Sequence, residues 1–185
     1  RNLLAADYLL FPNEYMEEKM SEAYMLDNLY NGVVLHEGYP RNSIFFLREN
    51  GERMKKRLGY EGQQLIMYMP TFRGKADQIE VEGFGTRIHQ HLHELDSRLS
   101  DEQTLLIKVH PFIQNQIEIS QYSHIKPIPE NIDSYEVLNA CDVLITDYSS
   151  VMYDFAITKR KIILFAYDYE EYIRERGMYE NITDY

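Results

Sequence analysis

Residues 142–150, DVLITDYSS, combine the pattern of a buried strand with that of a helix start. The apolar part of this stretch passes directly into small polar residues, and Ser149 and Ser150 stand where a following helix would begin. An apolar run of strand length without polar alternation is typical of a strand that is buried on both faces. A buried strand that turns into a helix is the unit from which parallel sheets are built.

Four other apolar runs of strand length accompany this stretch. Helical patterns lie between them: Ile88, Leu92 and Leu95 recur on one helix face, and Asp133 with Glu136 forms a variant of the capping box. The alternation of strands and helices predicts an α/β fold with a parallel sheet and helices on both of its faces. The four runs are residues 65–69, 105–109, 125–128 and 162–165.

Residues 1–60 follow a different pattern. Two short strands, in the segments DYLLFPN and GVVL, are separated by a helix that Asn13 can cap. A second amphipathic helix begins near Ile44 and ends at Gly59. Two strands make an incomplete sheet, so we divide the chain into the end of one domain, 1–60, and a second domain, 61–185. We expect an N-terminal half of the protein upstream.

Composition limits the classes of function. The 185 residues are 44% hydrophobic and 13% aromatic, which predicts a folded core. Thirty acidic against nineteen basic residues give a net charge of -11, which argues against a nucleic-acid partner. A single cysteine, Cys141 in an apolar stretch, favours a reduced compartment, and no apolar run reaches the ~18 residues of a membrane span. We therefore expect a cytoplasmic protein.

The polar residues that follow the predicted strands gather at one edge of the sheet, where ligands bind in parallel α/β folds. Ser149 and Ser150 can hold a phosphate at a helix start, or one of them can simply cap the helix. Asp154, one turn further on, can accept hydrogen bonds from ribose hydroxyls, or it can be a solvent-exposed helix acid. Asp147 would repel an anion, so we expect it to order the loop by bonding backbone N–H groups.

A second group of candidates lies in the segment KVHPF. Lys108 and His110 fall on the same side of a strand end, and Pro111 stops the strand there. An imidazole can exchange a proton near neutral pH, or as imidazolium steady a phosphate or a leaving group. A structural histidine is the alternative.

A third group lies in the segment PTFRG. Thr71 and Arg73 can direct a hydroxyl and a guanidinium toward a phosphate, although an ordinary surface loop would also have this composition. His89 and His93 stand four residues apart on a helix, but no third ligand accompanies them. The sequence therefore predicts no metal site.

Several segments together resemble the CDP-glycerol glycerophosphotransferase family, the teichoic-acid polymerases and primases of Gram-positive bacteria. The combination of TDYSSVMYDFA with KVHPF is the most specific part, and it is accompanied by GYPRNSIFF, MYMPTFRG and RGMY. The resemblance implies two Rossmann-like domains that face a cleft in the GT-B arrangement. The chain would supply the end of the first domain and, in residues 61–185, most of the second, nucleotide-donor-binding domain.

The resemblance also implies a reaction, the transfer of glycerol-phosphate or ribitol-phosphate from a CDP-activated alcohol to a lipid-linked teichoic acid acceptor, with release of CMP. No cofactor is implied, and the membrane-bound acceptor implies peripheral attachment at the inner face of the cell membrane. By the same resemblance His110 assists the departure of CMP, and Asp154 faces the ribose. The donor phosphates would be held by Thr71, Arg73, Lys108, Ser149 and Ser150.

One feature of the family is missing from the sequence. The family uses a histidine of a His-Gly motif in the first domain as the base for the acceptor hydroxyl, and His36 is not in that setting. Catalysis would therefore need the N-terminal domain as well. Two other functions remain open: a GT-B sugar transferase or epimerase that uses a CMP- or UDP-sugar, and a non-catalytic nucleotide-binding module.

Overall fold

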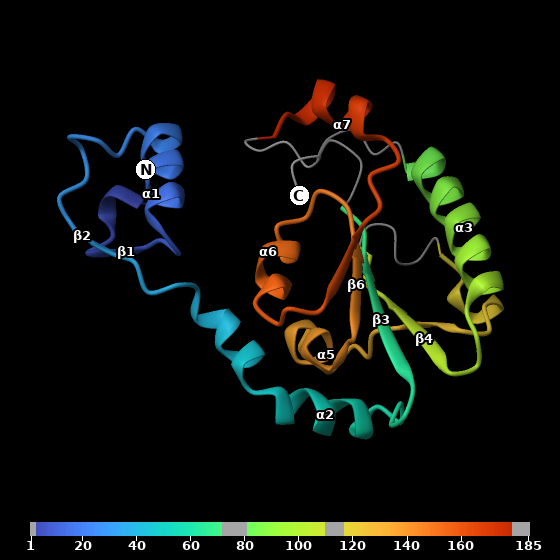
Figure 1. Cartoon of the computed structure of the whole chain (residues 1–185). Coiled ribbons are helices and arrows are strands. Elements are labelled where there is room, and N and C mark those ends of the chain that lie inside the picture. Colours follow the sequence, from blue (N-terminus) through green and yellow to red (C-terminus); the bar gives the residue numbers. More distant parts are fainter. Residues whose placement is uncertain (1–2, 72–80, 110–116, 179–185) are drawn as a thin grey trace. The chain divides into compact units, whose positions relative to one another are not determined.

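The structure is a computed structural model that describes residues 3–71, 81–109 and 117–178 (Figure 1). It contains two compact units, Arg1–Phe46 and Leu47–Tyr185. The division lies earlier than the boundary expected after residue 60, because helix α2 (Arg48–Arg57) packs on helix α5 (Ser134–Ala140) of the second unit. Within the described ranges, no helix is both long and apolar enough to cross a membrane.

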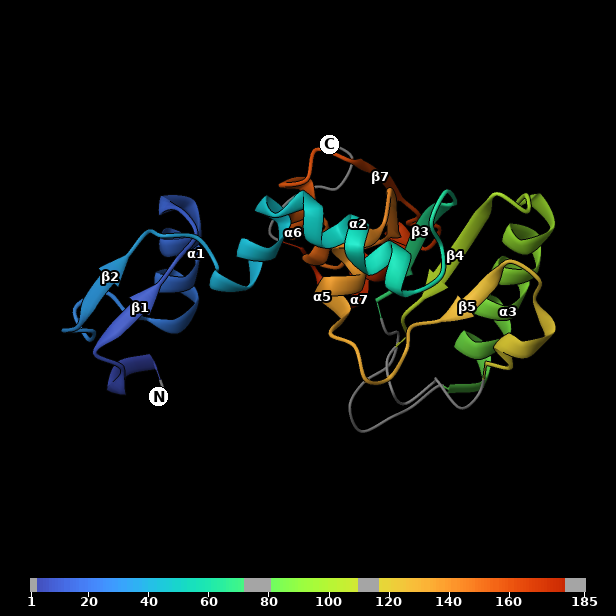
Figure 2. The same cartoon turned by 90° about the horizontal axis from the view of Figure 1, so that it is seen from below.

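The first unit is built around two parallel strands. Its elements are η1 (Leu3–Ala5), β1 (Tyr8–Leu10), α1 (Glu14–Tyr24), β2 (Val33–Leu35) and η2 (Pro40–Phe46). Figure 2 shows β1 and β2 side by side with α1 against them. The Asn13 side chain caps α1 by accepting a hydrogen bond of 2.9 Å from the N–H of Met16, as predicted. A small core of Leu9, Phe11 and Leu26 holds the unit together.

The second unit contains a parallel five-stranded sheet, which confirms the fold predicted from the sequence. The strands pair in the order β5-β4-β3-β6-β7, with every neighbouring pair parallel. They are β3 (Gln64–Met69), β4 (Gln103–Ile107), β5 (Ile125–Pro127), β6 (Val143–Thr146) and β7 (Lys161–Leu164).

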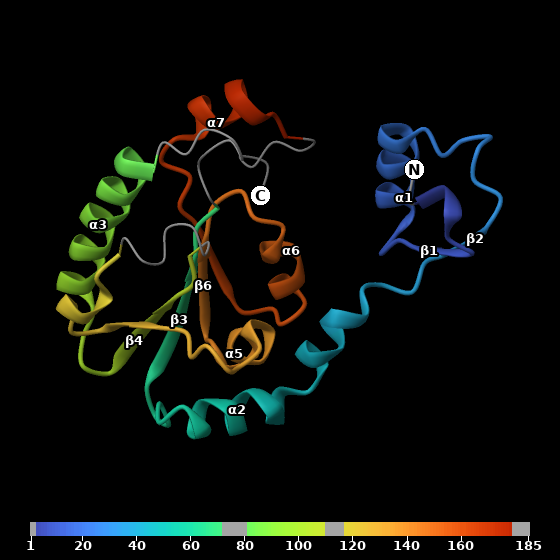
Figure 3. The ribbon, with the colours of Figure 1, turned by 180° about the vertical axis from the view of Figure 1, so that it is seen from behind.

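Helices cover both faces of this sheet (Figure 3). Helix α3 (Val81–Arg98) lies on one face, where Ile88 and Leu92 pack among strand residues such as Ile66 and Ile107. Helices α5 and α6 (Val151–Ala156) lie on the other, and α7 (Tyr169–Arg176) follows β7. A short turn, η3 (Ile119–Gln121), precedes β5.

The strand order places a switch point at the centre of the sheet. From β3 the chain winds through β4 to the edge strand β5, then returns to the other side of β3 to form β6 and β7. The direction of winding therefore reverses between β3 and β6. In open α/β sheets, ligands bind outside the carboxyl ends of the strands at such a point.

Gly51 brings α2 into close contact with α5. A Cβ at this position would overlap the backbone carbonyl oxygen of Asn139. The side chain of Asn139 in turn donates to the Leu47 carbonyl at 3.2 Å, so the contact continues to the start of α2. Close packing of two helix backbones explains why glycine, a poor helix former, stands inside this helix.

We expect Gly51→Ala to lower the free energy of unfolding by about 1–2 kcal/mol, because overpacking against backbone costs more than the ~1 kcal/mol that alanine gains in helix propensity. Chemical denaturation of the purified protein measures this change. The exposed neighbour Glu52 provides the control, since Glu52→Ala adds no atom to the contact and should leave stability within about 0.5 kcal/mol of wild type. Equal stability of the two variants would contradict the packing role of Gly51.

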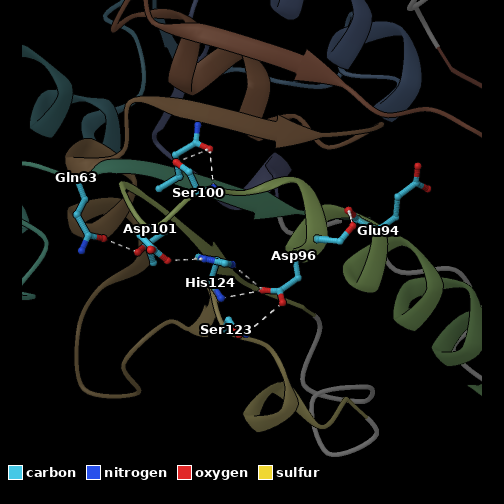
Figure 4. Close-up of polar contacts among 10 residues, drawn as sticks. Gln63, Glu94, Asp96, Ser100, Asp101, Ser123 and His124 are labelled. Atoms are coloured by element: carbon cyan, nitrogen blue, oxygen red, sulfur yellow. Dashed lines mark hydrogen bonds and ion pairs between the residues drawn. The ribbon is translucent and has the colours of Figure 1, made fainter.

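A network of polar contacts joins the loops at the amino edge of the sheet (Figure 4). Asp96 accepts hydrogen bonds from the backbone N–H groups of Ser123 (3.1 Å) and His124 (2.8 Å). The His124 ring lies between two carboxylates, with Nε2 3.2 Å from Asp101 and Nδ1 3.6 Å from Asp96. These contacts tie the end of α3 to the start of β5, at the edge opposite the switch point.

Candidate functional site

The candidate residues follow the carboxyl ends of three neighbouring strands. Thr71 comes after β3, Lys108 after β4, and residues 147–154 after β6. Arg73 and His110 lie outside the described residues. The described candidates therefore share one edge of the sheet, and two of their three strands, β3 and β6, flank the switch point.

Asp147 ties the exit of β6 to the exit of β3. Its side chain is 3% exposed, and both carboxylate oxygens accept from the backbone N–H of Thr71, at 2.9 and 3.1 Å. Oδ1 also accepts from the N–H of Tyr148 at 2.6 Å. Bonds to backbone N–H groups are what a loop-ordering carboxylate requires, and they turn this negative charge inward.

Thr146 makes a second connection between the same strands. Its hydroxyl donates to the carbonyl of Met69 at 2.7 Å, and its own carbonyl accepts from the N–H of Phe165 at 2.7 Å. The side chain is fully buried. The last residue of β6 is thus fixed to both neighbouring strands, and the polar turn begins from a rigid point.

Tyr148 connects the turn to helix α7. Its ring is buried and stacks on Tyr172, with 3.8 Å between ring centroids and 17° between planes. Its hydroxyl donates to Asp168 Oδ1 at 2.8 Å. This role could not be predicted from the sequence, because the partners are twenty or more residues away from Tyr148.

Ser149 and Ser150 lie at the start of α6 with their hydroxyls near the surface. The Ser149 hydroxyl accepts from the N–H of Val151 at 3.4 Å, a long contact. Ser150 is exposed and its side chain makes no capping hydrogen bond, although it occupies the cap position. The capping alternative is therefore wrong for Ser150, because the residue has helical backbone angles (φ -60°, ψ -10°) that direct its side chain elsewhere.

Asp154 is buried and paired with a tyrosine. It is 4% exposed, and Oδ2 accepts from the Tyr135 hydroxyl at 2.6 Å. The alternative of a solvent-exposed helix acid is thus wrong, because the carboxylate is buried and bonded to Tyr135 of α5. The ribose contact remains a prediction. The Tyr135 partner could not be foreseen from the sequence, where the two residues are nineteen positions apart.

Lys108 stands exposed directly after β4. Its backbone N–H continues the sheet by donating to the Tyr68 carbonyl at 2.9 Å, and the next residue, Val109, turns into the core. Side chains alternate along an extended chain, so the Lys108 ammonium faces away from that core. It is an exposed cation at the same edge as the serines.

Two histidines of α3, His89 and His91, contact aromatic residues of other elements. His89 Nδ1 lies 3.0 Å from the Tyr122 hydroxyl, and His93 is exposed. His91 packs edge-on against Phe165 and Tyr167, and its burial lowers its pKa, which favours the neutral ring. Among residues 3–71, 81–109 and 117–178, no group of three or more His, Cys, Asp or Glu is arranged to hold a metal ion.

The charges of this edge bear on the predicted phosphate site, because the protein has a net charge of -11. The carboxylates of Asp147, Asp154 and Asp168 each accept hydrogen bonds from protein donors. They are therefore partly compensated, while the exposed groups that remain include Ser150 and Lys108. An exposed hydroxyl and an exposed cation are groups that can bind phosphate oxygens.

The chain is similar to several known proteins. The sequence model of the CDP-Glycerol:Poly(glycerophosphate) glycerophosphotransferase family matches residues 1–185. The teichoic acid poly(glycerol phosphate) polymerase of Staphylococcus epidermidis is 34% identical over 96% of this chain and 25% of its own length. The teichoic acid glycerol-phosphate primase of Bacillus subtilis is 32% identical over 95% of this chain and 43% of its own.

Solved structures show the same relationship. The wall teichoic acid polymerase TagF superposes with a TM-score of 0.80 at 32% identity, over 99% of this chain and 46% of that one. An H444N variant of TagF with CDPG superposes with a TM-score of 0.75 at 32% identity, over 100% of this chain and 45% of that one. The chain thus spans between a quarter and a half of the length of these relatives.

Proposed function

Because the chain belongs to the CDP-glycerol:poly(glycerophosphate) glycerophosphotransferase family, we propose that it supplies the donor site of an enzyme that transfers glycerol-phosphate or ribitol-phosphate from a CDP-activated alcohol. The acceptor is a teichoic-acid-type chain, and CMP is the leaving group. This reaction agrees with the activities for which the polymerase and primase relatives are named. The enzyme combines the described second unit with an N-terminal domain upstream.

One observation carries the proposal: an exposed serine stands at the switch point on a turn that is fixed by its neighbours. Thr146 and Asp147 hold the turn to β3, Tyr148 holds it to α7, and Ser150 is left exposed without a capping bond. A turn fixed in this way can present hydroxyls to a diphosphate without reorganising.

The chemistry is an in-line displacement at the β-phosphorus of the donor. The acceptor hydroxyl oxygen forms the new bond, the bridging bond to CMP breaks, and CMP leaves with the electron pair. His110 stabilises or protonates the departing phosphate, and Arg73 and Lys108 offset the charge that develops. The base for the acceptor hydroxyl belongs to the N-terminal domain. Positioning and charge stabilisation carry most of the catalysis, so the proposal includes no resident cofactor.

We also propose where the enzyme acts. Its acceptor is lipid-linked, so the protein acts as a peripheral protein at the inner face of the membrane. The unit Arg1–Phe46 belongs to the acceptor side, α2 is the connecting helix and packs on the second unit, and residues 61–185 belong to the donor side.

The test is CMP release by the full-length protein with a lipid-linked glycerol-phosphate acceptor. Turnover of CDP-glycerol or CDP-ribitol, with none of UDP-glucose or a CMP-sugar, is the expected result. Turnover of a sugar nucleotide in place of the CDP-alcohols would instead show a sugar transferase, and tight binding of CDP without turnover would show a nucleotide-binding module.

We expect Ser150→Ala to weaken binding of CDP-glycerol about tenfold, because a hydrogen bond to a charged oxygen contributes roughly 1.5 kcal/mol. Isothermal titration calorimetry measures the affinity. Stability should not change, since the side chain makes no cap. Ser123→Ala is the matched control, an exposed serine at the amino edge, and it should bind as wild type does. Equal affinities of both variants would remove Ser150 from the donor site.

A further inference from the structure

We propose that Tyr148 is a positioning residue for the donor site, and that it acts by fixing the serine-bearing turn to helix α7 through Asp168 and Tyr172. This inference rests on the proposed function, since it assigns the anchor on which the phosphate-binding serines depend. No direct contact between Tyr148 and the donor is needed. The anchor is a property of the turn itself and is present before any ligand binds.

The geometry of the anchor has two parts. The Tyr148 hydroxyl donates to Asp168 Oδ1 at 2.8 Å, and the ring lies nearly parallel to that of Tyr172 at 3.8 Å between centroids. Tyr169 lies close by, with its ring centroid 6.4 Å from that of Tyr148. A buried aromatic ring with one polar end can fix both the position and the rotation of a loop.

Tyr148 lies next to the serines in the chain, so fixing Tyr148 also restricts them. The residue stands between Asp147, whose carboxylate is bonded to the exit of β3, and Ser149. Asp147 therefore fixes the beginning of the turn on one side, and Tyr148 fixes it on the other. The contacts of Asp147 and Tyr148 together restrict the backbone at Ser149. The hydroxyls of Ser149 and Ser150 are therefore held in defined positions.

The Asp168 partner also explains why α7 matters at this edge. Asp168 precedes α7 and occupies its cap position without making a side-chain cap bond. Its carboxylate serves Tyr148 instead of the helix that follows it. A carboxylate used in this way indicates a tertiary role for the residue and not a local one.

The experiment uses the full-length protein and compares Tyr148→Phe, Asp168→Asn and Asp168→Ala. Tyr148→Phe keeps the ring stack and removes the hydroxyl, so we expect KM for CDP-glycerol to rise about tenfold while kcat changes less than about twofold. Asp168→Asn keeps an oxygen that can accept a hydrogen bond from Tyr148, so its KM for CDP-glycerol should stay near that of wild type. Asp168→Ala should raise KM for CDP-glycerol as much as Tyr148→Phe does. The double variant, Tyr148→Phe with Asp168→Ala, should raise KM no further than either single variant.

Tyr122→Phe is the matched control. Tyr122 is also a buried tyrosine with a bonded hydroxyl, 3.0 Å from His89, but it lies beside α3 and away from the turn. It should lose stability without a rise in KM. A rise in KM equal to that of Tyr148→Phe would show a general effect of stability and would overturn the positioning role.

Hydrogen exchange separates the anchor from the proposed function. In the ligand-free protein, Tyr148→Phe should accelerate exchange of the amides at 148–153, and Tyr122→Phe should not. Unchanged exchange there, or unchanged KM in a wild-type enzyme that turns over CDP-glycerol, would overturn the anchor. If the turn loosens as expected but the wild type neither binds nor uses a CDP-alcohol, the proposed function fails and the donor role assigned to the anchor falls with it.

Discussion

His110→Ala in the full-length protein is expected to slow CMP release from CDP-glycerol by about 10²- to 10⁴-fold, the range of a positioned acid-base group. In the sequence His110 comes two positions after Lys108, which is exposed directly after β4. Loss of the imidazole leaves the departing phosphate without its proton donor or cation. The measurement is steady-state CMP release with saturating acceptor and donor.

The matched control is His93→Ala, which removes an exposed histidine from α3 and should leave turnover within about twofold of wild type. Both variants should show the same unfolding transition as wild type, so that the loss of rate cannot come from misfolding. Normal turnover by His110→Ala would remove this residue from the chemistry, while the binding role of the serines would still stand.

Asp147→Ala is expected to lower the free energy of unfolding by about 3 kcal/mol and to abolish measurable donor binding. The substitution leaves two buried backbone N–H groups, those of Thr71 and Tyr148, without their acceptor, and each such group costs roughly 1–3 kcal/mol. It also frees the turn from β3. Denaturation followed by calorimetry with CDP-glycerol tests both effects.

Two further variants provide a scale for the loss of stability in Asp147→Ala. Asp147→Asn keeps one oxygen, so it should lie between alanine and wild type in stability. Asp133→Ala removes a carboxylate that accepts one N–H, that of Tyr135, at an exposed helix cap, and it should cost only about 1 kcal/mol without loss of donor affinity. If Asp147→Ala lost no more stability than Asp133→Ala, the exits of β3 and β6 would not depend on this carboxylate.

The strands and the parallel sheet could be predicted from the sequence because burial on both faces leaves a continuous apolar run. Residues 143–145 are such a run, and β6 (Val143–Thr146) matches it closely. The second amphipathic helix of residues 1–60 was predicted less well. It is interrupted at Leu47, where the backbone leaves helical angles (φ -105°, ψ 75°), so η2 and α2 replace a single helix. The spacing of apolar residues stays helical across such a break. It therefore cannot show where one helix ends and the next begins.

The sequence predicted the features of the site that depend on strand direction and residue type, but not its long-range contacts. The edge of the sheet follows from strand direction, so Ser150 and Asp147 could be placed there. The partners of Asp154 and Tyr148 depend on how α5 and α7 pack, and pairing across nineteen or twenty residues leaves no periodic signal. For the same reason the sequence left open whether Asp154 faces water, and its burial beside Tyr135 shows that it does not.

The most direct measurement is a crystal structure of the full-length protein with CDP-glycerol bound. The diphosphate is expected at the carboxyl ends of β3 and β6, with a phosphate oxygen about 3 Å from the hydroxyl of Ser149 or Ser150. A diphosphate bound instead at the amino edge, beside His124 and Asp101, or on the strands β1 and β2 of the first unit, would contradict the donor site proposed for this turn.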